Sequence, residues 1–147
     1  MLVKLEELVA ELGESDRQER IELLIDLART LPPLPAHLSE HKDAAHRVPE
    51  CQSPVFLFPE REGDTFLLYA DVPPEAPTVR GFMAMLVEGL SGAPINDVVA
   101  MPPDIIERSG LRDLLGMQRV SGLHGVLRRL KDMAVRLAAG PSATPLS

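Results

Sequence analysis

The sequence predicts an α+β fold, in which a small antiparallel sheet packs with four or more helices. Three observations lead to this class. Apolar residues recur at helical spacing near both ends of the chain, two consecutive segments near the middle are typical of strands, and a Gly-containing loop joins those strands into a hairpin over about residues 54–71. No internal repeat or low-complexity tract interrupts this order.

Two amphipathic helices are expected at the N-terminus. Residues 1–12 place leucine and valine on one face, and Gly13 is expected to end this helix. Asp16 then resembles an N-cap, with Glu19 three residues later as its capping-box partner. The helix that follows runs to about Thr30, shortly before a Pro-Pro pair that cannot continue it. Its expected core positions are Ile21, Leu24, Ile25 and Ala28.

The predicted hairpin follows an irregular connector over residues 31–50. Its first strand covers about residues 54–60 and its second about 65–71. The loop between them, residues 61–64, contains Gly63, which can take a positive φ. Because the first strand is apolar on both faces, we expect it to be covered on both sides.

Helices are expected to dominate the rest of the chain. One spans about residues 78–90 and the last spans about 121–138, with short pieces broken by proline and glycine between them. A single domain should cover residues 1–139, and residues 140–147 should form a disordered tail. The expected buried stripe of the last helix consists of Leu123, Val126, Leu127, Leu130, Met133, Ala134 and Leu137.

Composition restricts the class of function. The chain has 147 residues, 45% of them apolar, and a formal net charge of −7. An acidic chain is a poor partner for nucleic acid or for anionic membranes, because both attract basic proteins. The N-terminus lacks the pattern of a signal peptide, and no apolar run is long enough to span a bilayer. We therefore expect a cytoplasmic protein without nucleic-acid or membrane partners.

Cys51 is the only cysteine and lies in the run Val48-Pro49-Glu50-Cys51-Gln52-Ser53-Pro54. The flanking prolines keep it out of a helix, so we expect it at the tip of a loop that leads into the first strand. A lone cysteine can be a small buried hydrophobic residue or a reactive thiol. It cannot form an internal disulfide, which fits a reducing compartment.

Four segments of the chain form a recognisable series. They are Leu31-Pro32-Pro33-Leu34 after an amphipathic helix, the cysteine run at 48–55, Val79-Arg80-Gly81 after the hairpin, and Arg119-Val120-Ser121-Gly122-Leu123 opening the last helix. Together they resemble the SufE family of sulfur-acceptor proteins, over roughly residues 15–138. The chain departs from the family at Glu50, where glycine is usual. Glutamate does not readily take a positive φ, and it places a negative charge beside the sulfur.

The resemblance implies a SufE/IscU-like fold and a defined chemistry. Cys51 would accept sulfur as a persulfide from a pyridoxal-phosphate-dependent cysteine desulfurase of the Suf type and stimulate that enzyme. It would then deliver the sulfur to an iron–sulfur scaffold complex. The chain would be an accessory protein rather than an enzyme, without a cofactor, and a monomer or weak homodimer. A single thiol suits a carrier, because a second cysteine would release the sulfur as hydrogen sulfide and form a disulfide.

A persulfide also needs shelter from other thiols before delivery. We therefore expect Cys51 to be mostly buried in the free chain, against Val55, Leu57 and the last helix from Leu123 onward. Two other interpretations stay open. The chain could be a thiol-dependent peroxidase-type enzyme that uses Cys51, or a plain interaction domain in which Cys51 is incidental.

Arg119 is the second candidate site residue. By its match to the family motif it would stabilise the sulfur anion or contact the desulfurase. The alternative is an ordinary solvated arginine just before a helix N-terminus, although that end of a helix favours anions. The last helix is also basic, which could steer a partner; its cations are Arg128, Arg129, Lys131 and Arg136.

Histidines near the cysteine raise the hypothesis of a metal site, because His, Cys and Glu are zinc ligands. His37, His41 and His46 precede Cys51, but their spacing fits no closed Cys/His module. The alternative is a polar surface connector, and no bound metal is expected. His124, beside the apolar stripe of the last helix, is expected to be a structural or surface histidine rather than a catalytic one.

Overall fold

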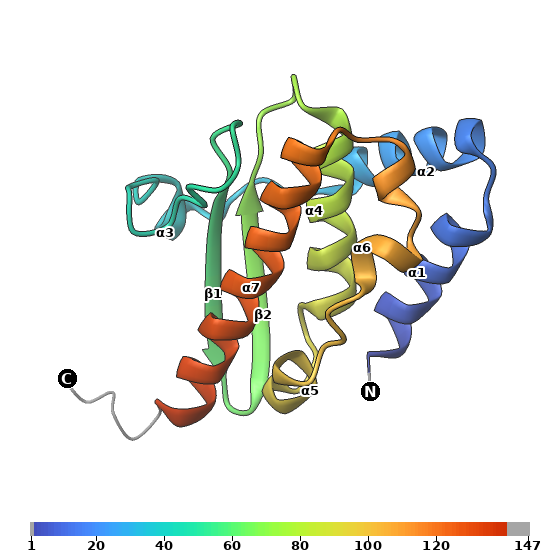
Figure 1. Cartoon of the computed structure of the whole chain (residues 1–147). Coiled ribbons are helices and arrows are strands. Elements are labelled where there is room, and N and C mark those ends of the chain that lie inside the picture. The colour runs from blue at the N-terminus through green and yellow to red at the C-terminus, as the bar shows by residue number, and fades with distance from the viewer. Residues whose placement is uncertain (1, 141–147) are drawn as a thin grey trace.

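The computed structural model describes residues 2–140 and confirms an α+β fold (Figure 1). A hairpin of strands β1 (Phe56–Glu62) and β2 (Thr65–Asp71) forms the sheet. Helix α7 (Met117–Ala139) lies along the hairpin, and helix α4 (Pro77–Leu90) separates the hairpin from the N-terminal helices. The other helical elements are α1 (Val3–Glu14), α2 (Arg17–Thr30), α3 (Ala36–Ser39), α5 (Ile95–Val99), α6 (Ile105–Arg108) and a 3-10 turn, Leu111–Asp113.

The hydrophobic core is continuous from α1 to α7, with α4 at its centre. Phe66 of β2 and Phe82 and Leu86 of α4 are fully buried within it. Aromatic residues are few, so leucine, valine, isoleucine, alanine and methionine fill most of this space. Each large side chain that is fully buried stabilises the fold by about 1.5–3 kcal/mol. Within residues 2–140, no helix has both the length and the apolar character that crossing a bilayer requires.

The first strand of the hairpin lies two residues later than predicted, whereas the second has the predicted limits. Instead of covering about residues 54–60, β1 begins at Phe56 and continues to Glu62, which pairs with Thr65. The turn therefore holds only two residues, Gly63 and Asp64. Gly63 takes a positive φ, as predicted, and its value of 61° allows this tight turn. The first strand is covered on both faces as expected, since the neighbouring side chains of Leu57 and Phe58 are both buried.

Local signals explain most of the N-terminal helices. Helix α2 begins after Asp16, whose carboxylate accepts a hydrogen bond from the Glu19 amide at 2.9 Å, and the reciprocal bond completes the capping box. Helix α1, however, does not end at Gly13 but continues to Glu14. The glycine serves packing instead, because a Cβ there would collide with the carbonyl oxygen of Arg108.

The expected core stripe of α2 is only partly correct. Leu24 and Ala28 are buried as predicted, whereas Ile21 and Ile25 are half-buried at its edge. Arg20, which the apolar pattern places on the surface, is buried in their stead and is 8% exposed. Arg20 is buried because its guanidinium donates hydrogen bonds to backbone carbonyls of neighbouring segments, which the apolar pattern of the helix cannot show.

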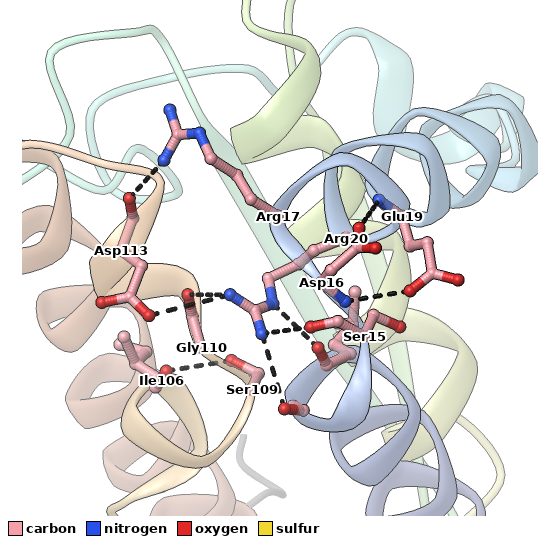
Figure 2. A network of polar contacts seen from close by, with 11 residues as sticks. Ser15, Asp16, Arg17, Glu19, Arg20, Ile106, Ser109, Gly110 and Asp113 are labelled. Atoms are coloured by element: carbon pink, nitrogen blue, oxygen red, sulfur yellow. Dashed lines mark hydrogen bonds and ion pairs between the residues drawn. The ribbon is translucent and has the colours of Figure 1, made fainter.

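Arg20 joins the end of α1 to the segment before α7 (Figure 2). Its Nε donates to the carbonyl of Leu12 at 2.8 Å, and its Nη2 donates to the carbonyl of Ser15 at 2.7 Å. Its Nη1 donates to the carbonyl of Gly110 at 3.3 Å and lies 3.8 Å from a carboxylate oxygen of Asp113. Carbonyls at a helix C-terminus have no partner in the helix, so a buried guanidinium satisfies several at once.

Replacing this guanidinium should destabilise the fold. We expect Arg20→Met to lower the free energy of unfolding by about 2–3 kcal/mol, because buried carbonyls lose a charged donor. Urea unfolding provides the measurement. Arg17→Met is the matched control, because Arg17 makes one exposed hydrogen bond, to the carbonyl of Asp113. An equal effect of the two substitutions would contradict the assigned role of Arg20.

The last helix begins earlier than predicted. It starts at Met117 after the N-cap residue Gly116 and ends at Ala139, whereas residues 121–138 were expected. Its buried stripe is confirmed, with Met133 and Leu137 partly buried at the edges. Gly140 is its C-cap residue, and the rest of the predicted disordered tail lies outside the described residues.

Candidate functional site

Cys51 lies in a short loop between the connector and β1, as the flanking prolines predict. The amide of Val48 donates to the carbonyl of Val55 at 2.9 Å and closes the base of this loop. Within it, the amide of Cys51 donates to the carbonyl of Val48 at 3.2 Å. The segment that precedes β1 and the N-terminal end of α7 lie at the same end of the molecule (Figure 1). We call residues 48–55 the Cys51 loop.

The thiol of Cys51 is buried, as expected for the free chain. The residue is 8% exposed, and its Sγ lies 3.9 Å from the carbonyl oxygen of Gly122 on α7. It borders a recess of about 310 Å³ that includes open solvent. Leu123 lines this recess as predicted, but Val55 and Leu57 belong to the core beneath; the second apolar wall is Val79 of α4. The remaining lining residues are Glu50, Gln52, Ser53, Gln118, Arg119 and Gly122.

The surroundings of Cys51 favour its protonated form. Burial raises the pKa of the thiol to about 11, and the neighbouring Glu50 carboxylate adds to this rise, while the Arg47 guanidinium opposes it. The thiol is therefore a weak nucleophile in this position, because the thiolate is the reactive species. Arg47 was not singled out from the sequence, since only the folded loop shows its charge acting on the sulfur.

The pH dependence of alkylation should report this environment. We expect the rate of Cys51 alkylation by iodoacetamide in the free chain to keep rising past about pH 10, because the pKa is raised to about 11. At neutral pH, two pKa units correspond to a roughly 100-fold lower thiolate fraction than in an unperturbed thiol. A stopped-flow profile of alkylation rate against pH, with free cysteine as the reference, measures the pKa of Cys51 and its reduced reactivity at neutral pH. A plateau near pH 9 would show that the thiol is not held in the recess.

Two glycines on α7 allow the Cys51 loop to lie directly on the helix. A Cβ at Gly122 would come within 2.9 Å of the carbonyl oxygen of Glu50. A Cβ at Gly125 would come within 2.6 Å of both Cβ and Cγ of Glu50. Gly122 belongs to the family motif, whereas Gly125 was not singled out from the sequence. The sequence signal that could have identified Gly125 is its spacing of three residues from Gly122, which places both glycines on one face of a helix.

Glu50 takes an ordinary backbone conformation, because no non-glycine residue in the described part of the chain has a positive φ. The family's usual glycine is therefore not needed here for backbone geometry. The Glu50 side chain instead runs along α7, and its carboxylate lies 3.9 Å from the guanidinium of Arg129.

Arg119 lines the same recess as Cys51, but its position in the helix differs from the expectation. Because α7 begins at Met117, Arg119 lies inside the first turn rather than before the helix. Its side chain is exposed and makes no hydrogen bond or ion pair with the other residues that the structure describes. Both interpretations of Arg119, as an anion stabiliser or partner contact and as a solvated arginine, stay open.

The histidines before the Cys51 loop do not converge on it. His37 pairs with Glu60 at 2.9 Å, and His46 pairs with Asp43 at 2.7 Å while stacking on Phe58. His41 is exposed. Among residues 2–140 no group of three or more His, Cys, Asp or Glu side chains is placed to hold a metal ion.

His124 is a half-buried residue on the side of α7, and its contact accounts for it structurally. Its Nε2 lies 3.0 Å from a carboxylate oxygen of Glu107 at the end of α6. A hydrogen bond from Arg112, with a weaker contribution from His124, holds the pKa of the Glu107 carboxyl below its usual value. The contact of His124 links α6 to α7, and His124 is not among the residues that line the recess beside Cys51.

Comparisons with known proteins agree with this arrangement. The sequence model of the family SufE, described as an Fe-S metabolism associated domain, matches residues 6–134. An uncharacterised SufE-like protein of Mycobacterium tuberculosis is 39% identical over 128 residues, which cover 86% of this chain and 88% of that protein. A cysteine desulfuration protein SufE of Plasmodium vivax is 27% identical over 126 residues, 84% of this chain and 48% of the relative.

A solved structure shares the fold as well. The solution structure of a hypothetical protein from Thermus thermophilus superposes with a TM-score of 0.80 at 31% sequence identity. The match covers 93% of this chain and 97% of the Thermus protein. The overall fold of this chain is therefore found in another solved protein.

Proposed function

The chain belongs to the SufE family, and from this premise we propose that Cys51 accepts sulfur from a cysteine desulfurase and carries it as a persulfide. The family gives the chain a role in iron–sulfur metabolism as an accessory protein. The observation that carries the finer proposal is the state of Cys51, the only thiol of the chain, sheltered at 8% exposure beside a recess.

The proposed transfer is a thiol exchange at sulfur. The thiolate of Cys51 attacks the outer sulfur of a persulfide on the desulfurase cysteine, forming a new S–S bond to Cys51. The original S–S bond breaks, and the desulfurase cysteine leaves as a thiolate. No external oxidant or reductant is needed, because the sulfane sulfur keeps its oxidation state and changes its carrier. With no second thiol in the chain, the persulfide cannot be lost to an internal disulfide.

The free chain is poorly suited to attack by itself, and this supports dependence on a partner. Its thiol has a raised pKa and lies against the carbonyl of Gly122. A docked desulfurase would draw the Cys51 loop out of the recess, where the thiolate forms more readily. The partner's pyridoxal phosphate would generate the sulfur, so this chain would need no cofactor of its own. Removal of sulfur would in turn speed the desulfurase.

The remaining expectations complete the proposal. The chain would work in the cytoplasm as a monomer or weak homodimer and would pass its sulfur to an iron–sulfur scaffold complex. The desulfurase would be of the Suf type. The formal net charge of −7 supports protein partners over nucleic acid.

The test is the intact mass of the chain after incubation with a Suf-type desulfurase, pyridoxal phosphate and cysteine. We expect the addition of one sulfur, located on Cys51 by peptide mapping and removed by a reducing agent. Turnover of dilute peroxide with a sulfenic acid on Cys51 would instead support the peroxidase. That outcome is disfavoured by a thiol pKa of about 11, since peroxidatic cysteines need a ready thiolate. If Cys51 acquired neither modification, the result would support an interaction domain in which Cys51 is incidental.

A further inference from the structure

Glu50 is the residue beside the thiol, and its side chain lies against α7 although it is partly exposed. Its Cβ and Cγ lie against Gly125, so closely that a Cβ on that glycine would stand 2.6 Å from each. The carboxylate then reaches Arg129, one helical turn further along α7, with 3.9 Å between Oε1 and Nη2. Glu50 therefore spans two positions on the same face of the helix.

Arg129 is only partly satisfied within the described residues. Its Nε is buried and has no hydrogen-bond partner among them. Glu50 and Arg129 border a groove along α7, about 540 Å³ with the open solvent included, that is also lined by further cations and one carboxylate. The other lining residues are Gly125, Arg128, Asp132, Met133 and Arg136. The carboxylate of Glu50 is the group that connects this basic groove to the Cys51 loop.

The two contacts restrain the residue next to the sulfur. A movement of the Cys51 backbone out of the recess would lift the adjoining backbone at Glu50 away from Gly122, where a Cβ would be 2.9 Å from the Glu50 carbonyl oxygen. Such a movement separates Glu50 from Gly125 and from Arg129 as well. A glycine at position 50 would make neither side-chain contact, so the restraint is specific to a chain with glutamate there.

We propose that Glu50 is a positioning residue that holds Cys51 in its buried position through its contacts with Gly125 and Arg129. The proposal rests on the proposed function, since it concerns how the sulfur carrier keeps its thiol sheltered before docking. Both partners of the ion pair are about one-third exposed, at 31% for Arg129 and 38% for Glu50, so the restraint is modest. A sulfur donor that offers its own carboxylate to Arg129 would compete with Glu50 and release the loop.

The decisive variant is Arg129→Met, because two explanations predict opposite signs. If Arg129 acts on Cys51 only through its charge, removing a cation disfavours the thiolate and slows alkylation. If Arg129 holds Glu50, its removal loosens the Cys51 loop and accelerates alkylation. We expect a roughly two- to fivefold faster reaction with iodoacetamide at neutral pH, the range set by a partly exposed ion pair. A slower or unchanged rate would overturn the proposal.

Further variants separate restraint from charge and from unfolding. Glu50→Gln should also accelerate alkylation, but it removes the neighbouring negative charge as well, so it serves as the background for a double variant. Adding Arg129→Met to Glu50→Gln should leave the rate unchanged, because the ion pair is already broken, whereas a pure charge effect of Arg129 would slow it. Arg129→Lys should restore most of the slow rate. Arg136→Met is the matched control, since it removes a cation of the same groove but leaves the ion pair of Glu50 with Arg129 in place, and it should leave the rate unchanged.

Global unfolding is excluded by repeating the alkylation in low urea, where a local opening has little denaturant dependence. If Arg129→Met reduces stability, Arg129→Gln replaces it and must still react faster than the parent chain. The readouts also keep the two proposals apart. If the parent chain accepts no sulfur in the mass experiment, the carrier function is refuted. If Arg129→Met is still alkylated faster than the parent chain, the restraint by Glu50 is supported independently.

Discussion

Cys51→Ser is expected to abolish sulfur acceptance completely while leaving the fold intact. Cys51 is the only thiol, so no other side chain can form a persulfide. A serine hydroxyl is not an acceptor of sulfane sulfur, because its alkoxide does not form at neutral pH. The sulfur of Cys51 makes only a long contact of 3.9 Å with the Gly122 carbonyl, and the smaller hydroxyl fits the same space. The cost to stability should be about 1 kcal/mol, that of placing a hydroxyl in an apolar site.

The measurement combines intact mass with desulfurase turnover. The parent chain should gain one sulfur and speed cysteine consumption, whereas Cys51→Ser should do neither and should still unfold cooperatively in urea. A pull-down with the desulfurase separates binding from chemistry, since the variant keeps its surface and should still bind. Sulfur retained by the serine variant would refute Cys51 as the acceptor.

The local elements could be predicted because their signals lie within a few residues. Gly63 between two apolar segments indicated the hairpin, and Asp16 with Glu19 indicated the start of α2. The start of α7 could not be placed in the same way. The Ser-Gly pair at 121 and 122 is typical of a helix boundary, yet the helix runs through it from Met117. Gly122 is needed there for the approach of Glu50, a contact between segments about 70 residues apart.

Long-range contacts also explain the residues that were missed. Arg20 is an ordinary surface residue in the pattern of α2, and its burial depends on carbonyls at the end of α1 together with the carbonyl of Gly110, which is 90 positions away. The burial of Cys51 was expected from the needs of a carrier, but its wall at Val79 comes from α4 through the tertiary fold. The contact of Glu50 with Arg129 arises in the same way, whereas Arg47 is close to Cys51 in sequence and acts on the thiol through the shape of the folded loop.

The structure also gives a physical reason for one of the family segments. Val79-Arg80-Gly81 was noted as a match, without a role for its glycine. In α4, Gly81 faces α2, and Arg80 donates to the carbonyls of Ala28 and Val72 beside it. These contacts place α2 against α4 and fix the helix that carries Val79 to the recess.

Gly81→Ala is expected to lower the free energy of unfolding by roughly 3 kcal/mol, although alanine normally stabilises a helix interior by about 1 kcal/mol. A Cβ at this position would overlap the carbonyl oxygen of Leu24 and stand 2.9 Å from its carbonyl carbon and 3.0 Å from its Cα. These are backbone atoms of α2, so no side-chain rotation relieves the overlap. The two helices must separate, which opens the packing around Leu24 and Phe82, both fully buried.

The measurement is the free energy of unfolding in urea for Gly81→Ala and for a control variant, Gly116→Ala. Gly116 is the N-cap residue of α7, has a negative φ of −69° and has no atom within 4 Å of an added Cβ. The control tests the loss of a glycine without a collision, and it should change stability by less than about 1 kcal/mol. Because α4 also carries Val79, Gly81→Ala should increase the alkylation rate of Cys51, which the control should not. A Gly81→Ala chain as stable as its parent would mean that α2 and α4 are not packed as closely as these backbone distances require.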